Sequence, residues 1–208
     1  PLVLERVYPH LEFDKPVSIH PLPGSQRLVV CEQGGRIYSF DRQAESAAAE
    51  LLADFNAQRP PLSEIAANAS TRIDLYSLAF HPDFARNRRV VVCYVVQGGG
   101  ARFADGTHIA SFELSRSEPP QLLMETEQTV FRFDTGGHNG CCVAFDQDGL
   151  LYISTGDVAS PTPPDPYNHG QNVGDVYSAI LRIDMDRPSE GRGYSIPADN
   201  PFVDLPGA

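Results

Sequence analysis

The sequence feature that most constrains the fold is a loosely repeated unit of two apolar runs separated by a polar turn. It occurs as RLVVCEQGGRIYSFD (27–41), LAFHPDFARNRRVVVCYVV (78–96) and VAFDQDGLLYISTGD (143–157). The second and third copies share the form apolar-Ala-Phe-x-x-Asp, followed by a turn and a β-branched or aromatic run. Repeats of about 40–50 residues with four strands each are typical of propeller blades. The repeats therefore predict an all-β protein with about three blades of four antiparallel strands.

Ten runs rich in Val, Ile, Tyr and Phe and bounded by turn residues have the composition of strands. They are Pro16–Ile19, Arg27–Glu32, Arg36–Phe40, Leu75–Phe80, Arg89–Val96, Thr107–Leu114, Thr129–Phe133, Cys141–Phe145, Leu150–Thr155 and Ala179–Asp184. One stretch differs, because AESAAAELLADF (44–55) is rich in Ala, Leu and Glu. This composition favours a short helix, with a solvated loop as an equally good alternative.

Three blades are too few to close a ring, because propellers use roughly 4 to 8 blades to protect their sheet edges. The last residues, NPFVDLPGA (200–208), have loop composition and no closing strand. We therefore expect residues 1–208 to be the N-terminal part of one propeller domain. The missing blades would follow in a longer chain, or another chain or copy would cover the open edge.

Charge argues against a nucleic-acid partner, and hydropathy argues against a membrane-spanning segment. The chain has 27 acidic and 16 basic side chains, a formal net charge of −11. Such a surface repels phosphate backbones, so a nucleic-acid partner is not expected. No apolar run approaches the ~20 residues needed to span a bilayer, so we expect no membrane span.

The four cysteines at positions 31, 93, 141 and 142 fit no zinc-site spacing. Successive residues of a strand point to opposite faces, so at most one of Cys141 and Cys142 can readily meet Cys93 across a sheet. Free buried thiols are an equally good interpretation, and the sequence does not choose between them.

The stretch FDTGGHNGCCVAFDQDGLLYISTGD (133–157) holds the candidate catalytic residues. Three glycines around His138 would let backbone or ligand approach its imidazole closely. Histidine is also well suited to proton abstraction near neutral pH. Asp157 ends the same hairpin unit, where a carboxylate could orient the imidazole of His138 and stabilise its charged form. The alternative is a tight Asn-Gly turn that happens to carry a histidine, and a turn aspartate bonded to its own backbone.

We do not expect His81, His108 or His169 to bind a metal. His81, in the sequence FHPDF, is interpreted as a turn residue with a structural hydrogen bond, and His108 and His169 have no acidic partner at ligand spacing. We therefore predict no metal ligand among the histidines. Aspartates of the 157–175 loop offer oxygen ligands of the kind that calcium takes, but acidic loops are common on a chain this acidic.

Several motifs together resemble the glucose/sorbosone dehydrogenase family. They are SLAFHPDF (77–84), GGHNG (136–140), AFDQDGLLYISTGD (144–157), ILRIDMDRP (180–188) and YSIPADNPF (194–202). They follow the family's order from about Val17 to the end of the chain. The resemblance implies a six-bladed β-propeller that uses pyrroloquinoline quinone (PQQ) with calcium to oxidise a sugar.

The resemblance also implies roles for single residues. His138 matches the family's general base, which takes a proton from the sugar C1 hydroxyl, and Asp157 matches the aspartate that supports it. Gln171, in DPYNHGQN (165–172), lies where the family places a cofactor-facing glutamine. Three features depart from the pattern: Arg72 replaces a glutamine that contacts PQQ, Gly137 replaces a residue that is often acidic, and the glycine pair after the histidine survives only as Gly140 followed by Cys141.

The expected function is therefore PQQ-dependent oxidation of an aldose or sorbosone-like sugar, in the periplasm or outside the cell. A cytochrome or another acceptor would take the electrons. The family's cofactor-clamping arginines and calcium loops lie beyond Ala208, so we do not expect these 208 residues alone to be a competent enzyme. The alternative is a non-catalytic binding propeller related to hedgehog-interacting proteins, which the changes at Arg72 and Gly137 favour. A calcium-dependent lactone hydrolase is a weaker third possibility, with no ligands to assign.

Overall fold

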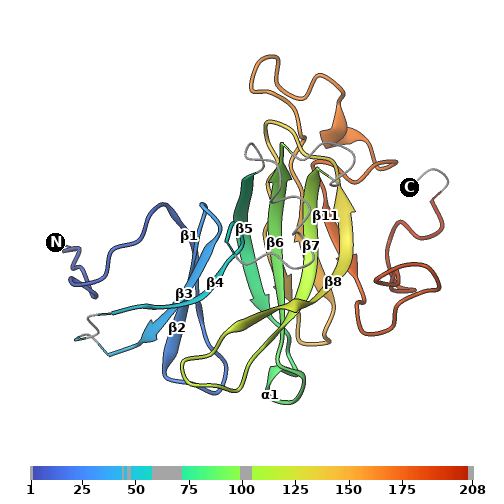
Figure 1. The fold of residues 1–208 in the computed structure, drawn as a ribbon. Helices are drawn as coiled ribbons and strands as arrows, with labels where there is room; N and C mark the ends of the chain where they lie inside the picture. Colours follow the sequence, from blue (N-terminus) through green and yellow to red (C-terminus); the bar gives the residue numbers. More distant parts are fainter. Residues whose placement is uncertain (1, 44, 46–47, 58–71, 99–104, 206–208) are drawn as a thin grey trace.

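The described residues form three antiparallel sheets that follow one another along the sequence (Figure 1). The computed structural model describes residues 2–43, 45, 48–57, 72–98 and 105–205. The first sheet comprises β1 (Pro16–Pro21), β2 (Arg27–Glu32), β3 (Arg36–Asp41) and β4 (Glu50–Asp54). The second comprises β5 (Arg72–Phe80), β6 (Arg89–Gln97), β7 (Gly106–Leu114) and β8 (Leu122–Phe133). The third comprises β9 (Val143–Phe145), β10 (Leu151–Ser154) and β11 (Ile180–Ile183). The single turn α1 (Phe84–Asn87) and the 3₁₀ turn η3 (His169–Gln171) are the helical elements described.

Turn chemistry explains why each sheet is a simple meander. Between β2 and β3, Gly35 has φ +97°, a conformation that L-residues rarely adopt. Between β9 and β10, the carboxylate of Asp146 accepts the backbone N–H groups of Asp148 and Leu150 at 2.9 Å each. Both turns are short, so consecutive strands pair as antiparallel neighbours.

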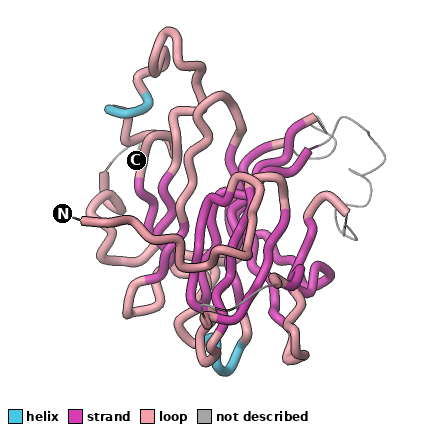
Figure 2. Tube along the Cα trace, turned by 90° about the vertical axis from the view of Figure 1, so that its left-hand side faces the viewer, coloured by secondary structure: helices cyan, strands magenta, loops and turns pink. Residues whose placement is uncertain are grey.

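The strands of neighbouring sheets lie alongside one another (Figure 2). Two large hydrophobic clusters fill the layers between the sheets, and a smaller cluster packs the N-terminal segment against the first sheet. Strand β6 shows this layering most clearly, because its sequence RVVVCYVVQ is buried along its whole middle. Val92 and Tyr94 pack toward the first sheet, whereas Val91 and Cys93 pack toward the third. The second sheet is therefore buried on both faces, which explains its near-continuous apolar runs.

The first strands of the three sheets lie beside one another, as they do around a propeller axis. Strand β1 neighbours β5, and β5 neighbours β9. The Oγ of Ser77 in β5 accepts the N–H of Val143 in β9 at 3.2 Å. The connections after β8 and after β10 and the start of β5 all lie at the end of the molecule opposite α1 (Figure 1). The fold is thus a partial β-propeller, and this end carries the candidate site.

All ten predicted strands overlap observed strands, and the interval predicted for β2 is identical. Both alternatives expected for 44–55, a short helix or a loop, are wrong at residues Glu50–Asp54, which form β4. Pairing with β3 and burial of Leu52 and Ala53 override the helix propensity of this stretch. Residues 44, 46 and 47 of the predicted helix lie outside the described residues. Strand β8 is longer than predicted, because bulges let it extend back to Leu122.

Apolar side chains are exposed on the outermost sheets. Val17 and Ile19 of β1 are 42% and 56% exposed, and Ile180 of β11 is 75% exposed. Beside β1, a hollow of about 560 Å³ is lined by residues such as Tyr8, Phe13 and Ile19. Within the described residues, no helix is long and apolar enough to cross a membrane.

Candidate active site

Two loops at one end of the sheets are joined along their backbones. The first follows β8 and carries His138, and the second follows β10 and carries Asp157. The N–H of His138 donates to the carbonyl of Ala159 at 3.0 Å, and the N–H of Val158 donates back to the carbonyl of His138 at 3.0 Å. Gly137 and Gly156 donate two further bonds, at 3.1 and 2.9 Å. Four backbone bonds therefore fix the two loops against each other.

Glycines permit this close approach. A β-carbon on Gly136 would lie 1.7 Å from the carbonyl oxygen of Val158, and one on Gly137 would lie 2.2 Å from that of Ala159. A β-carbon on Gly156 would lie 2.0 Å from the carbonyl oxygen of His138. These contacts are far inside van der Waals distance, so any side chain at these positions would push the loops apart. The glycines around His138 thus let a second backbone lie against this loop, whereas close approach of a ligand to the imidazole stays a prediction.

His138 and Asp157 form a hydrogen-bonded pair, as the hairpin argument predicted. The Nδ1 of His138 lies 3.1 Å from the Oδ1 of Asp157. The imidazole is about half exposed (47%), whereas the carboxylate is largely covered (16%). The same carboxylate oxygen accepts the N–H of Ala159 at 3.0 Å. The pair thus has one end fixed to the backbone and the imidazole end open to solvent.

The electrostatics of the pair keep Asp157 ionised. The Ala159 amide foremost, with the hydrogen bond and charge of His138, holds the pKa of the Asp157 carboxyl below its usual value, against an opposing effect of desolvation. An ionised carboxylate accepts a hydrogen bond from the Nδ1–H group of the neutral imidazole. In this tautomer Nε2 keeps a free lone pair. The arrangement can therefore accept a proton at Nε2 and stabilise the imidazolium that results.

Asn139 is a site residue that sequence reasoning treated only as part of a turn. Its side chain is buried, and its Oδ1 accepts the hydroxyl of Thr135 at 2.8 Å and the N–H of Gly136 at 2.7 Å. The amide thus closes the loop internally, immediately beside His138. The Asn-Gly dipeptide signalled a turn, but nothing in the sequence indicated a buried side chain.

The two predicted cofactor-binding residues do not join the pair in the part of the chain that the structure describes. Arg72 begins β5, at the same end as His138, and its guanidinium bonds the largely buried Asp74 at 2.6 and 2.9 Å. Gln171 lies exposed in η3, and its Nε2 donates to the carbonyl of Gly170 at 2.8 Å. Both remain predictions as cofactor contacts.

His81 has the structural role predicted for it. It is buried, its Nε2 lies 2.9 Å from the Oδ2 of Asp186, and its Nδ1 accepts the N–H of Asp83 at 3.1 Å. His169 differs from expectation, because its Nδ1 lies 2.8 Å from the Oδ2 of Asp175. The turn that follows η3 brings this aspartate back, which spacing alone did not reveal.

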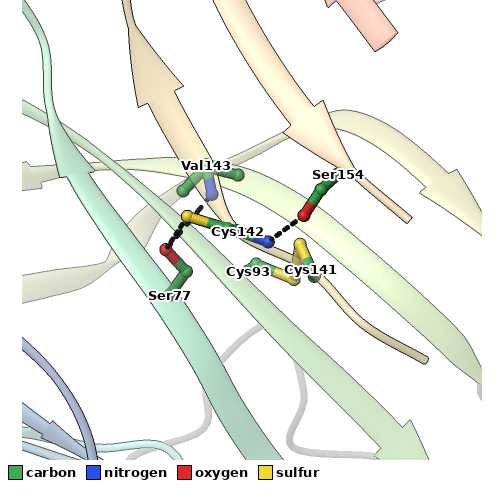
Figure 3. Close-up of a disulfide and its surroundings, with 6 residues drawn as sticks. All are labelled: Ser77, Cys93, Cys141, Cys142, Val143 and Ser154. Carbon is green, nitrogen blue, oxygen red and sulfur yellow. Dashed lines mark hydrogen bonds between the residues drawn. A yellow bond between two sulfur atoms is a disulfide. The ribbon is translucent and has the colours of Figure 1, made fainter. Parts of the chain in front are cut away.

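The disulfide joins Cys93 in β6 to Cys141 (Figure 3), which decides between the two alternatives that the sequence left open. Cys31 is a buried free thiol and Cys142 an exposed one. Burial raises the pKa of the Cys31 thiol to about 11, despite a hydrogen bond with Ser18 that lowers it. Cys141 and Cys142 precede β9, which begins at Val143, rather than belonging to the strand.

No group of three or more His, Cys, Asp or Glu side chains that could hold a metal ion occurs among the residues described. The aspartates of the 157–175 loop instead bond backbone amides or histidines, as Asp165 does with the N–H of His169 at 2.8 Å. The described residues therefore do not fit a calcium site. The guanidinium of Arg72 lies at the same end of the sheets as His138 and is paired there with Asp74.

Comparison with known proteins identifies the family. The sequence model of the Glucose / Sorbosone dehydrogenase family matches residues 13–208. The chain belongs to this family. Among curated relatives of this family member, human Hedgehog-interacting protein is 28% identical over 191 residues, which cover 88% of the chain and 26% of that protein. HIPL2 protein of Arabidopsis thaliana is 28% identical over 228 residues, with 88% and 32% covered.

Solved structures in the comparison share the fold. The PQQ-bound aldose sugar dehydrogenase of Streptomyces coelicolor aligns with a TM-score of 0.66 at 24% identity, over 100% of this chain and 52% of that one. The apo form of the soluble aldose sugar dehydrogenase of Escherichia coli aligns with a TM-score of 0.62 at 24% identity, over 94% and 49%. The chain thus spans about half the length of these enzymes and about a quarter to a third of the curated relatives.

Proposed function

We propose that this chain supplies the proton-accepting side of the active site of a PQQ-dependent sugar dehydrogenase. The observation that carries the proposal is the His138–Asp157 pair, with its imidazole half exposed and its carboxylate held by a backbone amide at 3.0 Å. Family membership and the fold shared with aldose sugar dehydrogenases support it. The substrate would be an aldose or a related sugar.

The mechanism follows from the pair. A sugar hydroxyl placed against the open face of His138 would give its proton to Nε2 as the C–H bond of the same carbon breaks. Asp157 would hold the imidazole in the required tautomer and stabilise its positive charge. PQQ, when bound, supplies the hydride acceptor. Arg72 and Gln171 are the residues of this chain that we propose to hold it, Arg72 through a guanidinium suited to carboxylates.

The domain and its surroundings are part of the same proposal. The exposed apolar side chains of β1 and β11 support further blades, in a longer chain or from another chain, that complete a six-bladed propeller. The Cys93–Cys141 disulfide supports a periplasmic or secreted location. A cytochrome or another acceptor would reoxidise the cofactor. We assign no calcium ligand to the described residues.

A non-catalytic binding propeller is the second candidate. The identity of 28% to Hedgehog-interacting protein favours it, together with the ion pair that already occupies the guanidinium of Arg72. In this case the His138–Asp157 pair would be a remnant that orders the loops without chemistry.

A PQQ titration followed by absorbance separates the two candidates. It is run with calcium on the 208-residue chain and on a protein extended beyond Ala208 by the remaining blades. Saturable binding by the longer protein, followed by sugar-dependent dye reduction, supports the dehydrogenase. Absence of binding by both would overturn the PQQ assignment and leave the binding propeller.

A further inference from the structure

The segment that joins His138 to β9 passes through two consecutive residues with positive φ. Gly140 has φ +63° and Cys141 has φ +103°. Glycine adopts such angles freely, but a residue with a β-carbon does so only where its surroundings enforce them. Cys141 therefore holds an unfavourable backbone conformation three residues after the histidine.

The disulfide between Cys93 and Cys141 restrains the backbone of Cys141 (Figure 3). Cys141 is bonded to Cys93, a completely buried residue in the middle of β6. Cys93 is the register partner of Ser77 in β5, and Ser77 accepts the N–H of Val143 at 3.2 Å. Two neighbouring positions of the rigid second sheet thus anchor the chain just where it leaves the His138 loop.

Hydrogen bonds fix the two sides of this anchor, whereas Cys141 itself is held by the disulfide and by packing in the apolar layer between the second and third sheets. On one side, Gly137 and His138 are bonded to the 158–159 backbone. On the other, the N–H of Cys142 donates to the Oγ of Ser154 at 2.9 Å. Without the disulfide, only apolar packing would oppose a return of Cys141 to negative φ, and we expect that rotation to move the His138 loop relative to Asp157.

We infer that Cys141, through its disulfide with Cys93, is a positioning residue for His138. This inference rests on the proposed function, because it concerns the orientation of the proposed base. The disulfide keeps Cys141 at a positive φ that otherwise favours glycine. The loop before Cys141 thereby holds the imidazole of His138 against Asp157.

Paired variants test the inference on the 208-residue chain. Both Cys93→Ala/Cys141→Ala and Cys93→Ala/Cys141→Gly lack the disulfide, but only the second restores a residue that tolerates φ +103°. Hydrogen exchange is measured at the amides of Gly137, His138, Gly156 and Val158, which donate the bonds between the loops. The amide of Val29 in the first sheet reports on general stability, and Cys142→Ser controls for loss of a neighbouring thiol.

In the alanine variant we expect these four amides to exchange about tenfold faster or more, with Val29 unchanged. The pKa of Asp157, followed by NMR, should rise toward its ordinary value as the bonds from Ala159 and His138 loosen. The glycine variant and Cys142→Ser should stay close to the wild-type chain. Equal exchange in the alanine variant and wild type would overturn the inference. So would equal acceleration in both double variants, or acceleration that includes Val29.

Activity distinguishes this inference from the proposed function. In the longer protein with PQQ, the alanine variant should lose about tenfold or more in kcat with little change in KM, and the glycine variant should recover most of it. If the wild-type protein does not oxidise sugars but the selective exchange pattern holds, the proposed function is wrong and the positioning role stands. If activity is present and both double variants retain it fully, the positioning role is wrong.

Discussion

The second sheet and the His138 loops are held together in opposite ways. Strands β5 to β8 are fixed by apolar side chains buried on both faces, such as Leu75 and Val91, which are completely inaccessible. The loops are fixed by direct backbone hydrogen bonds, which Gly136 and Gly156 permit because they have no side chain, and by one disulfide. The comparison teaches that the sheet depends on side chains that fill its buried layers, whereas the loops depend on glycine positions that leave no room for a β-carbon.

The largest expected loss of stability lies in the sheet. Leu75→Ala removes a completely buried side chain from the layer between the first and second sheets. We expect the free energy of unfolding to fall by about 2–5 kcal/mol, because a cavity remains. Chemical denaturation measures this loss, while the pKa of Asp157 should stay at its wild-type value below the transition. A shift of that pKa would show that the two regions are not independent.

An intermediate effect is expected in the loops. Gly156→Ala places a β-carbon 2.0 Å from the carbonyl oxygen of His138, so the loops must separate. We expect a loss of about 1–3 kcal/mol in unfolding free energy and weaker protection of the Gly137 and Val158 amides. Gly34→Ala is the matched control, because a β-carbon there meets nothing within 4 Å. Similar losses in both variants would contradict the close-approach argument.

Much of the sheet could be predicted from sequence because apolar runs and turn residues repeat locally. Strand β2 was predicted at its observed bounds, and β6 within one residue. Strand β4 could not be predicted, because the sequence ELLAD has no strand pattern and becomes a strand only by pairing with β3. The difference is physical, since local composition reports propensity but not the partner that satisfies the backbone.

The candidate site was predicted in part for the same reason. His138 and Asp157 stood out through neighbouring glycines and a hairpin, both of which are local signals. The buried amide of Asn139 and the His169–Asp175 pair depend on where loops return in space. Cys141 rather than Cys142 bonds Cys93, and this depends likewise on the backbone conformation of Cys141, φ +103°, which residue type does not predict.

The smallest expected effect concerns a buried carboxyl in the sheet. Burial raises the pKa of Glu127, despite a hydrogen bond from the hydroxyl of Tyr94 that lowers it. Because the folded-state pKa is raised, the stability contribution is complete below the ordinary pKa of Glu and is lost as pH rises through the raised value. Glu127→Gln should therefore match the wild-type chain at low pH and exceed it by about 1 kcal/mol or less at pH 8. Denaturation at both pH values measures the difference, and a variant that is less stable at pH 8 would contradict the account.

The central claim is that His138 accepts the proton in a sugar oxidation, and one measurement tests it most directly. It compares kcat for sugar-dependent dye reduction between His138→Ala and wild type, in the PQQ-loaded protein extended beyond Ala208. The account predicts a loss of about 10²–10⁴-fold, the usual contribution of a general base, with an unchanged melting transition. A loss of less than about tenfold would remove His138 from that role.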